Sequence, residues 1–153
     1  MDTAVNVTAL ALRQPTPVAV RKPAWPDGIA PVIGIDGQRY FPHVNGGGLV
    51  ADTAYVNGSV YVAPHARVGG RALVDGPVKV LDEAVIDDEA IVVGRCVLRH
   101  RARVIERATL LGQIVVINDA LIQGDARIEG AVLIEYFGTV GNNSRIIGHL
   151  RFS

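Results

Sequence analysis

Four histidines are the side chains of this sequence best suited to acid–base or metal chemistry. They are His43, His65, His100 and His149. His65 and His100 lie 35 residues apart. Both fall in a part of the chain that is rich in charges, which include Asp82, Glu83, Arg101 and Asp119. A general base at His100 would need a substrate proton within hydrogen-bond reach. We favour a ladder of solvent-exposed charges instead, because this part of the chain lies away from the surface where copies are expected to meet.

The single cysteine and a run of three glycines are two further candidates for chemistry. Cys96 has no partner for an intrachain disulfide, and it occupies an apolar column of the repeat described below, so we expect it to serve packing. The glycines at 46–48 are followed by neither Lys-Ser nor Lys-Thr and precede no predicted helix. They are better interpreted as the turn that leads into a β-helix. The sequence therefore predicts no catalytic, cofactor-binding or metal-ligating residue.

Length and composition indicate one soluble domain with short appendages. The chain has 153 residues, no formal net charge and 49% hydrophobic residues, but only 5% aromatic residues. A core must then be built from Ala, Val, Ile and Leu. The charge balance gives no attraction to nucleic acid or to an anionic membrane, and no apolar run is long enough to span one. We expect a protein made in the cytosol, without nucleic-acid or membrane partners.

An uninterrupted six-residue period is the dominant feature of the chain. Stepping by six from Ala54 to Leu150 gives small or aliphatic residues at every position, and stepping from Val56 to Phe152 gives large apolar ones. Two inward positions separated by one outward residue make a minimal strand, and the remaining residues must turn the chain. A strand-plus-turn unit repeated without a break predicts a parallel β-helix.

This pattern resembles the hexapeptide-repeat family and its [LIV]-[GAED]-X2-[STAV]-X motif. The segment "HVNGGGLVADTAYVNGSVYV" at 43–62 resembles the opening coils of transferase-like hexapeptide proteins of bacteria and phages. The resemblance implies a left-handed β-helix with three hexads in each triangular coil, and it also implies trimers. The handedness comes from the resemblance alone, because the general rule for crossovers favours the right-handed form. The expected fold is all-β, a left-handed parallel β-helix of about six triangular coils with an extended N-terminal arm and a short hairpin.

A second period of eighteen residues marks one corner of the triangle with glycine. The residues concerned are Gly58, Gly76, Gly94, Gly112, Gly130 and Gly148. A glycine in every coil predicts a positive φ or close approach by another backbone. We call this edge of the prism the glycine corner.

The two faces beside the glycine corner carry apolar residues at outward positions, where a solvated strand would be polar. We expect trimer contacts through Gly58, Gly76, Gly94, Gly112 and Gly130, with Leu73, Ile91, Val93 and Leu111 of one chain packing on Leu81, Val97, Val115 and Ile117 of its neighbour. Three triangular prisms that meet at one corner form a closed cyclic trimer.

The N-terminal part of the chain breaks the repeat. Residues 1–31 hold five of the eight prolines and predict an extended docking arm, residues 32–47 a hairpin and turn, and residues 48–153 the β-helix. Trp25 is the expected anchor in a pocket of a shell protein or a neighbouring trimer, with Arg21 and Lys22 at the rim. The alternative is that the arm wraps its own prism and hides apolar coil surface.

Two functions of different classes remain open from the sequence. The first is a non-enzymatic structural trimer, most plausibly a phage virion decoration or cement protein held by its arm to a capsid or shell protein. The second is a hexapeptide-type acyltransferase acting at a subunit cleft, although the ejected loop and C-terminal helix common in that family have no counterpart here. A bacterial housekeeping protein without known chemistry is a third, less specific possibility.

Overall fold

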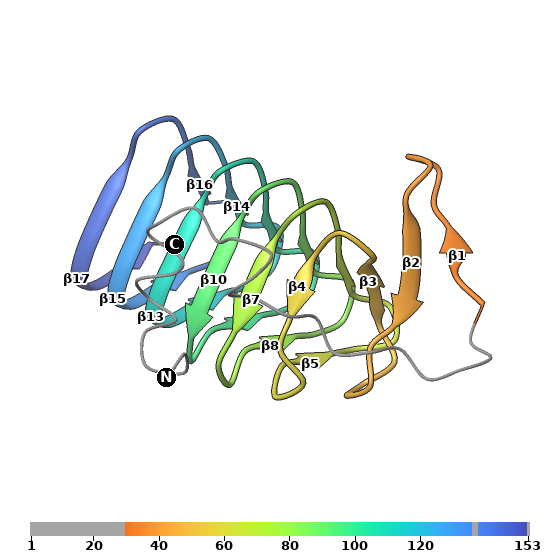
Figure 1. Ribbon diagram of the computed structural model, residues 1–153. Helices are drawn as coiled ribbons and strands as arrows, with labels where there is room; N and C mark the ends of the chain where they lie inside the picture. The colour runs from red at the N-terminus through yellow and green to blue at the C-terminus, as the bar shows by residue number, and fades with distance from the viewer. Residues whose placement is uncertain (1–29, 136–137, 153) are drawn as a thin grey trace, which may run out of the picture.

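The computed structural model describes residues 30–135 and 138–152, which form a parallel β-helix of about six turns. The described residues contain strands and turns but no helix, and therefore none that could cross a membrane. Successive coils stack along one axis, with the hairpin at one end (Figure 1). The all-β fold predicted from the six-residue period is confirmed.

The strands fall on three faces of the prism. Face 1 holds β4 (Tyr55–Val56), β7 (Leu73–Asp75) and β10 (Ile91–Gly94). Face 2 holds β5 (Tyr61–Val62), β8 (Lys79–Val80) and β11 (Val97–Leu98). Face 3 holds β3 (Leu49–Ala51), β6 (Arg67–Val68), β9 (Val85–Ile86), β12 (Arg103–Val104), β14 (Leu121–Ile122) and β16 (Thr139–Val140). The longer strands β13 (Thr109–Val116), β15 (Arg127–Ile134) and β17 (Arg145–Phe152) cross the glycine corner, so faces 1 and 2 form one bent sheet.

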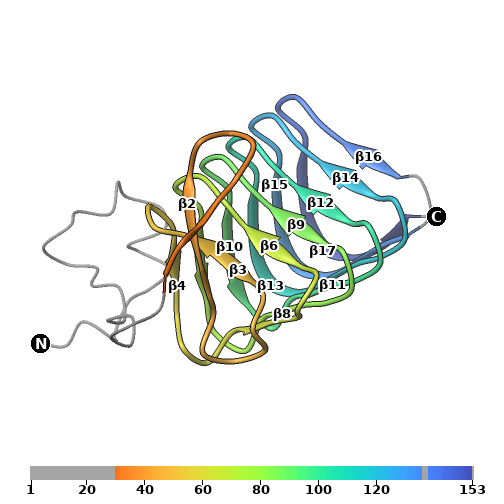
Figure 2. The same ribbon diagram turned by 90° about the vertical axis from the view of Figure 1, so that its right-hand side faces the viewer.

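The β-helix is left-handed. Figure 2 views the prism from its N-terminal end, with face 1 on the left, face 2 below and face 3 on the right. The chain passes through the faces in that order while it recedes from the viewer, which is a counterclockwise path. This is the hand that the family resemblance implied and the opposite of the general preference for crossovers.

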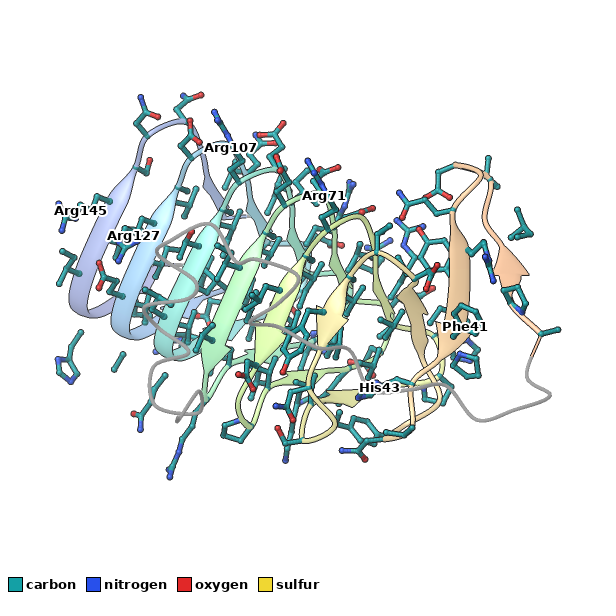
Figure 3. All side chains as sticks on the ribbon, in the orientation of Figure 1. Phe41, His43, Arg71, Arg107, Arg127 and Arg145 are labelled. Carbon is teal, nitrogen blue, oxygen red and sulfur yellow. The ribbon has the colours of Figure 1, made fainter. Side chains whose placement is uncertain are left out.

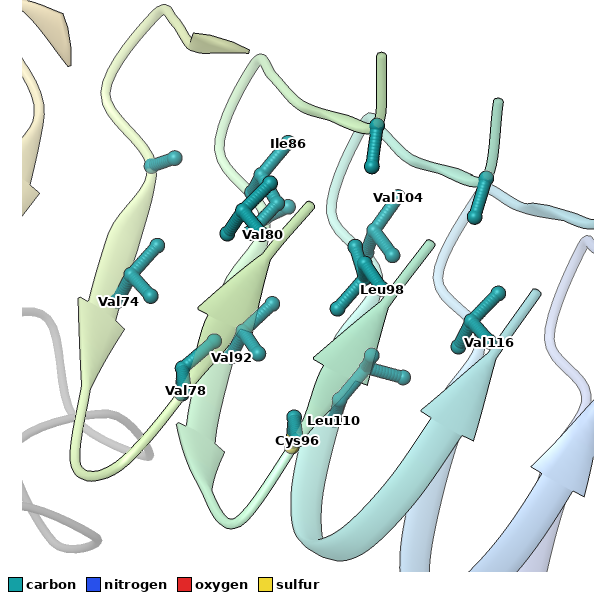
Figure 4. Packing of buried hydrophobic residues seen from close by; sticks show 14 of the residues in the cluster. Val74, Val78, Val80, Ile86, Val92, Cys96, Leu98, Val104, Leu110 and Val116 are labelled. Atoms are coloured by element: carbon teal, nitrogen blue, oxygen red, sulfur yellow. The ribbon is translucent and has the colours of Figure 1, made fainter. Parts of the chain in front are cut away.

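The interior is filled by the two apolar columns of the six-residue period. Side chains such as Val74, Val80 and Ile86, one from each face, are fully buried and point into the interior of the prism (Figure 4). Strand pairs are in register at a separation of eighteen residues, as in Val92 with Leu110, so each column stacks on itself. Among the described residues of these columns, Ser144 in the last coil is exposed and Gly138 is half-buried.

Each corner of the prism needs a residue in the left-handed region of backbone conformation. At the glycine corner, φ lies between 90° at Gly76 and 124° at Gly112. The other two corners use Asp82, His100 and Asn118, and Gly70, Asp88, Glu106, Gly124 and Asn142. Asp and Asn tolerate this conformation better than most residues with a Cβ. The expectation of positive φ is confirmed from Gly76 to Gly148 but is wrong for Gly58, which has no left-handed φ.

The N-terminal end of the prism is closed by a hairpin. Strands β1 (Val32–Ile33) and β2 (Arg39–Pro42) are antiparallel, with Asp36 and Gly37 in the turn as predicted, and β2 pairs antiparallel with β3. Tyr40 is buried at this end. The glycine run at 46–48 forms the turn from β2 to β3, and Gly48 donates its N–H to the carbonyl of Val62.

Candidate interaction surface

The predicted contact residues of face 1 form two neighbouring ladders on the outside of the sheet. Leu73 pairs in register with Ile91, and Val93 pairs with Leu111. Their outward direction follows from the alternation of side chains along a strand, because Val74, Val92 and Leu110 between them are fully buried.

The predicted contact residues of face 2 lie on the other side of the glycine corner. Val97 pairs in register with Val115, and both are half-buried. Leu81 and Ile117 follow β8 and β13 and are also half-buried. The structure therefore brings all eight apolar residues to the two faces that flank one corner. Their contact with a second chain stays a prediction.

The two faces differ in how much apolar surface they leave accessible. Leu73 keeps 4% of its exposure and Leu111 keeps 8%, although both point outward from the coil. Ile91 and Val93 are half-buried. The accessible apolar surface of face 1 is thus smaller than the sequence pattern predicts and lies mainly on β10.

Contacts within a single chain explain why glycine recurs at the glycine corner. A Cβ built on Gly94 would lie 2.5 Å from the carbonyl oxygen of Gly112, and one on Gly112 would lie 2.5 Å from that of Gly130. The backbone that approaches each glycine therefore belongs to the next coil of the same chain. Gly58 has nothing within 4 Å of such an atom, so neither reason for glycine applies there.

A shallow pocket lies on face 2 beside the first two coils. Its volume is about 390 Å³, and its lining includes Asn45, Ser59, Tyr61, Lys79 and Leu81. The wall combines an aromatic ring, an aliphatic side chain and an ammonium group. A pocket of this kind suits a side chain that is part apolar and part acidic.

Asp75 is a buried charge on face 1 that sequence reasoning passed over as one of many outward residues. It keeps 7% exposure, and its Oδ1 accepts a 2.7 Å hydrogen bond from the N–H of Gly76. The signal that could have found it is an acid next to the glycine corner in an otherwise apolar run.

The charged corner that contains His100 is a ladder of side chains that accept backbone hydrogen bonds. Asp82 accepts from the N–H of His100 at 2.9 Å, and Nδ1 of His100 accepts from the N–H of Asn118 at 3.2 Å. Arg101 and Asp119 form an ion pair at 2.7 Å beside it. His100 thus uses one ring nitrogen to accept a hydrogen bond from the backbone of the next coil, a role that the prediction of an exposed charge ladder did not include.

The third corner repeats this arrangement with a different set of charges. Glu106 donates its N–H to Asp88, and Gly124 donates its N–H to Glu106. The outer edge carries ion pairs of 2.8 Å between Arg71 and Glu89 and between Arg107 and Asp125. Arg71 and Arg107 lie along the same edge of the prism (Figure 3). These side chains therefore form hydrogen bonds and ion pairs between successive coils of the same chain.

His43 is a buried titratable group to which the sequence analysis assigned no role. It lies at the hairpin end (Figure 3), keeps 4% exposure, and its Nε2 is 2.8 Å from the carbonyl oxygen of Val60. Burial lowers the pKa of His43 below its ordinary value. The ring is therefore neutral near pH 7 and donates from Nε2.

Cys96 lies inside the coil stack, where the six-residue period placed it. Its Sγ is fully buried and lies 3.6 Å from the carbonyl oxygen of Gly112. Burial raises the pKa of the Cys96 thiol to about 12, so the thiolate is scarce at neutral pH. Within the described part of the chain, no group of three His, Cys, Asp or Glu residues is arranged to hold a metal ion.

The predicted arm residues Arg21, Lys22 and Trp25 lie outside the described residues. Comparison of the chain with protein-family models, with curated proteins and with solved structures found no match.

Proposed function

We propose that this chain is a structural protein of the hexapeptide-repeat type without enzymatic activity, which acts as a trimer whose three prisms meet at the glycine corner. The observation that carries the proposal is the pair of apolar outward ladders on faces 1 and 2. Ile91 and Val93 lie on one side of the corner, and Val97 and Val115 on the other. Apolar residues on two faces that share an edge suit a ring of identical copies, because face 1 of each copy meets face 2 of the next.

The shape of the prism limits which residues can touch in such a ring. Triangular sections are wedges, so three of them around one edge leave clefts that widen away from the axis. Contact is then concentrated on the outward positions closest to the corner. In the two middle coils these positions hold Val93 and Leu111 on face 1 and Val97 and Val115 on face 2. Burying Val93, Val97 and Val115, which are half-buried in the single chain, removes apolar area from water, which stabilises by roughly 25 cal/mol for each Å².

We further propose that the trimer decorates a larger assembly, most plausibly a phage capsid, through residues 1–31. Prolines at 15, 17, 23, 26 and 31 fix φ and reduce the entropy that an extended segment loses when it binds a surface. Trp25 is the anchor, because large aromatic residues dominate binding energy in interfaces. The resemblance of residues 43–62 to hexapeptide proteins of bacteria and phages supports this choice of assembly.

The experiment compares the full chain with a variant that lacks residues 1–31, using particles purified from the native source. Both proteins are sedimented with the particles through a density gradient. We expect the full chain to travel with the particles and the shortened chain to remain at the top as a trimer. The β-helix core lies outside the deleted segment, and circular dichroism checks that it is intact.

Two results would contradict the arm proposal. If the shortened chain binds the particles as tightly as the full chain, the prism itself makes the contact. If neither protein travels with particles, and the native protein is found free in solution, the chain is no decoration protein.

A further inference from the structure

The surface beside the glycine corner contains a buried carboxylate without a cation. Asp75 is more than nine-tenths buried, and among the described residues it forms no ion pair with Lys, Arg or His. Within the described residues, its side chain accepts one hydrogen bond, from the neighbouring N–H of Gly76. Glu135, the other buried carboxylate on these two faces, is paired with Arg151 at 2.7 Å. A buried charge without a partner is costly, which suggests that the cation for Asp75 comes from outside the described part of the chain.

A lysine in the same coil as Asp75 lies on the other side of the glycine corner. Lys79 is exposed, lines the pocket on face 2, and forms no ion pair within the described residues. Asp75 is the last residue of β7, directly before Gly76, and Lys79 is the first residue of β8. The two residues belong to the same coil, so in a ring around the glycine corner they lie at the same height.

The register of the strands makes this pairing specific to one alignment of the copies. In the next coil the positions of Asp75 and Lys79 are taken by Val93 and Val97. A shift of one coil between neighbours would place Asp75 against Val97 and leave its charge without a cation. A shift of one coil in the opposite direction would bring Lys79 against Val93. Both contacts are unfavourable, so either shifted alignment is disfavoured.

We propose that Asp75 of one copy forms an ion pair with Lys79 of the neighbouring copy, and that this pair favours the closed ring, in which the copies are level, over a staggered arrangement of copies. The proposal rests on the trimer of the proposed function and adds the chemistry that aligns it. It identifies the partner of this surface as a second copy of the chain, held in coil-for-coil alignment.

The test reverses the two charges separately and together in the full-length chain. Asp75→Lys and Lys79→Asp each place like charges at every interface, whereas the double variant restores opposite charges with the sign exchanged. Sedimentation equilibrium measures the protein concentration at which half of the trimers dissociate. We expect each single reversal to raise this concentration by at least about tenfold, and the double variant to recover most of the loss.

Two controls separate the interface from the fold. Arg103→Asp reverses an exposed charge on face 3, away from the glycine corner, and we expect it to leave dissociation within about twofold of the unaltered protein. Thermal unfolding followed by circular dichroism shows whether a reversed variant keeps the β-helix. If Asp75→Lys fails to fold, Asp75→Asn removes the carboxylate instead. Combined with Lys79→Asp, it should relieve the repulsion between Asp75 and the new Asp at position 79, and so recover part of the loss that Lys79→Asp causes alone.

The failure of this inference differs from the failure of the proposed function. If the unaltered chain is monomeric at all concentrations, the trimer itself is wrong. If it is trimeric and neither reversal changes its dissociation, the trimer stands and the ion pair is wrong. If the single reversals weaken the trimer but the double variant does not recover, Asp75 takes its cation from elsewhere, such as Arg21 or Lys22, and the pairing with Lys79 is again wrong.

Discussion

Individual residues at the corners determine whether one coil can stack on the next. Gly94 and Gly112 combine a left-handed φ with a carbonyl oxygen where a Cβ would lie. Asp82 and Glu106 also adopt a left-handed φ, and their carboxylates accept backbone N–H groups of the following coil. The next coil can therefore stack at a corner either because glycine has no side chain there, or because the corner side chain accepts a hydrogen bond from the backbone of that coil.

The first residue-scale prediction concerns the glycine column. Gly112→Ala places a Cβ 2.5 Å from the carbonyl oxygen of Gly130 in a left-handed conformation. We expect the free energy of unfolding to fall by about 3 kcal/mol, from backbone strain and overpacking together. Gly58→Ala is the matched control, because Gly58 has neither a left-handed φ nor a close neighbour. Urea unfolding checks both variants, and equal effects would contradict the explanation.

The second residue-scale prediction concerns pH. Because burial lowers the pKa of His43 in the folded chain, the unfolded chain binds a proton more readily. The free energy of unfolding should therefore fall as pH drops below the ordinary histidine pKa, and level off once the lowered pKa is passed. His43→Gln removes the titrating group, so its stability should depend less on pH between about 7.5 and about 5. Urea unfolding at both pH values measures the difference, and an unchanged slope would show that other groups cause it.

At the scale of the elements, the hairpin closes an end that the repeat alone would leave exposed to water. Tyr40 on β2 is 1% exposed, and its hydroxyl donates a 2.7 Å hydrogen bond to Asp36 in the turn. Burial is the first cause that raises the pKa of Tyr40, to about 12, so the hydroxyl keeps its proton. The hairpin is thus tied to the core by one aromatic side chain and to its own turn by that side chain's hydroxyl.

The element-scale prediction separates these two roles of Tyr40. Tyr40→Phe keeps the ring and loses the hydrogen bond to Asp36, which should cost about 1 kcal/mol of unfolding free energy. Tyr40→Ala removes the ring from the end of the core and should cost about 3–5 kcal/mol. Chemical unfolding measures both. A small effect of Tyr40→Ala would mean that the hairpin does not seal the core.

The elements also show which features of the fold could be predicted. The strands were predictable because every inward position follows the six-residue period, and Asp36-Gly37 is a strong turn signal. The corner ladders were not, because the pattern shows that Asp82 and His100 are polar but not that they accept backbone hydrogen bonds one coil away. Nor could it predict the burial of Leu73, Asp75 and Leu111, which depends on what surrounds each side chain. Gly58 fits the eighteen-residue period without needing to be glycine.

At the scale of the whole molecule, the account depends on one edge of the prism. Val93→Asp and Val115→Asp each place a charge in the apolar ladders on either side of the glycine corner. We expect each to convert trimers to monomers, because three unpaired charges per trimer cost several kcal/mol in an apolar interface. Val85→Asp is the matched control, since Val85 is half-buried at an outward position of face 3. If both variants remain trimeric, these two faces bind another partner and do not form the trimer interface.

Sedimentation equilibrium of the unaltered full-length chain tests the central claim most directly. The account predicts a single species with three times the 16.3 kDa mass of the chain, stable at micromolar concentration. A monomer across the whole concentration range would contradict it, as would a dimer, because the account places three copies around the glycine corner.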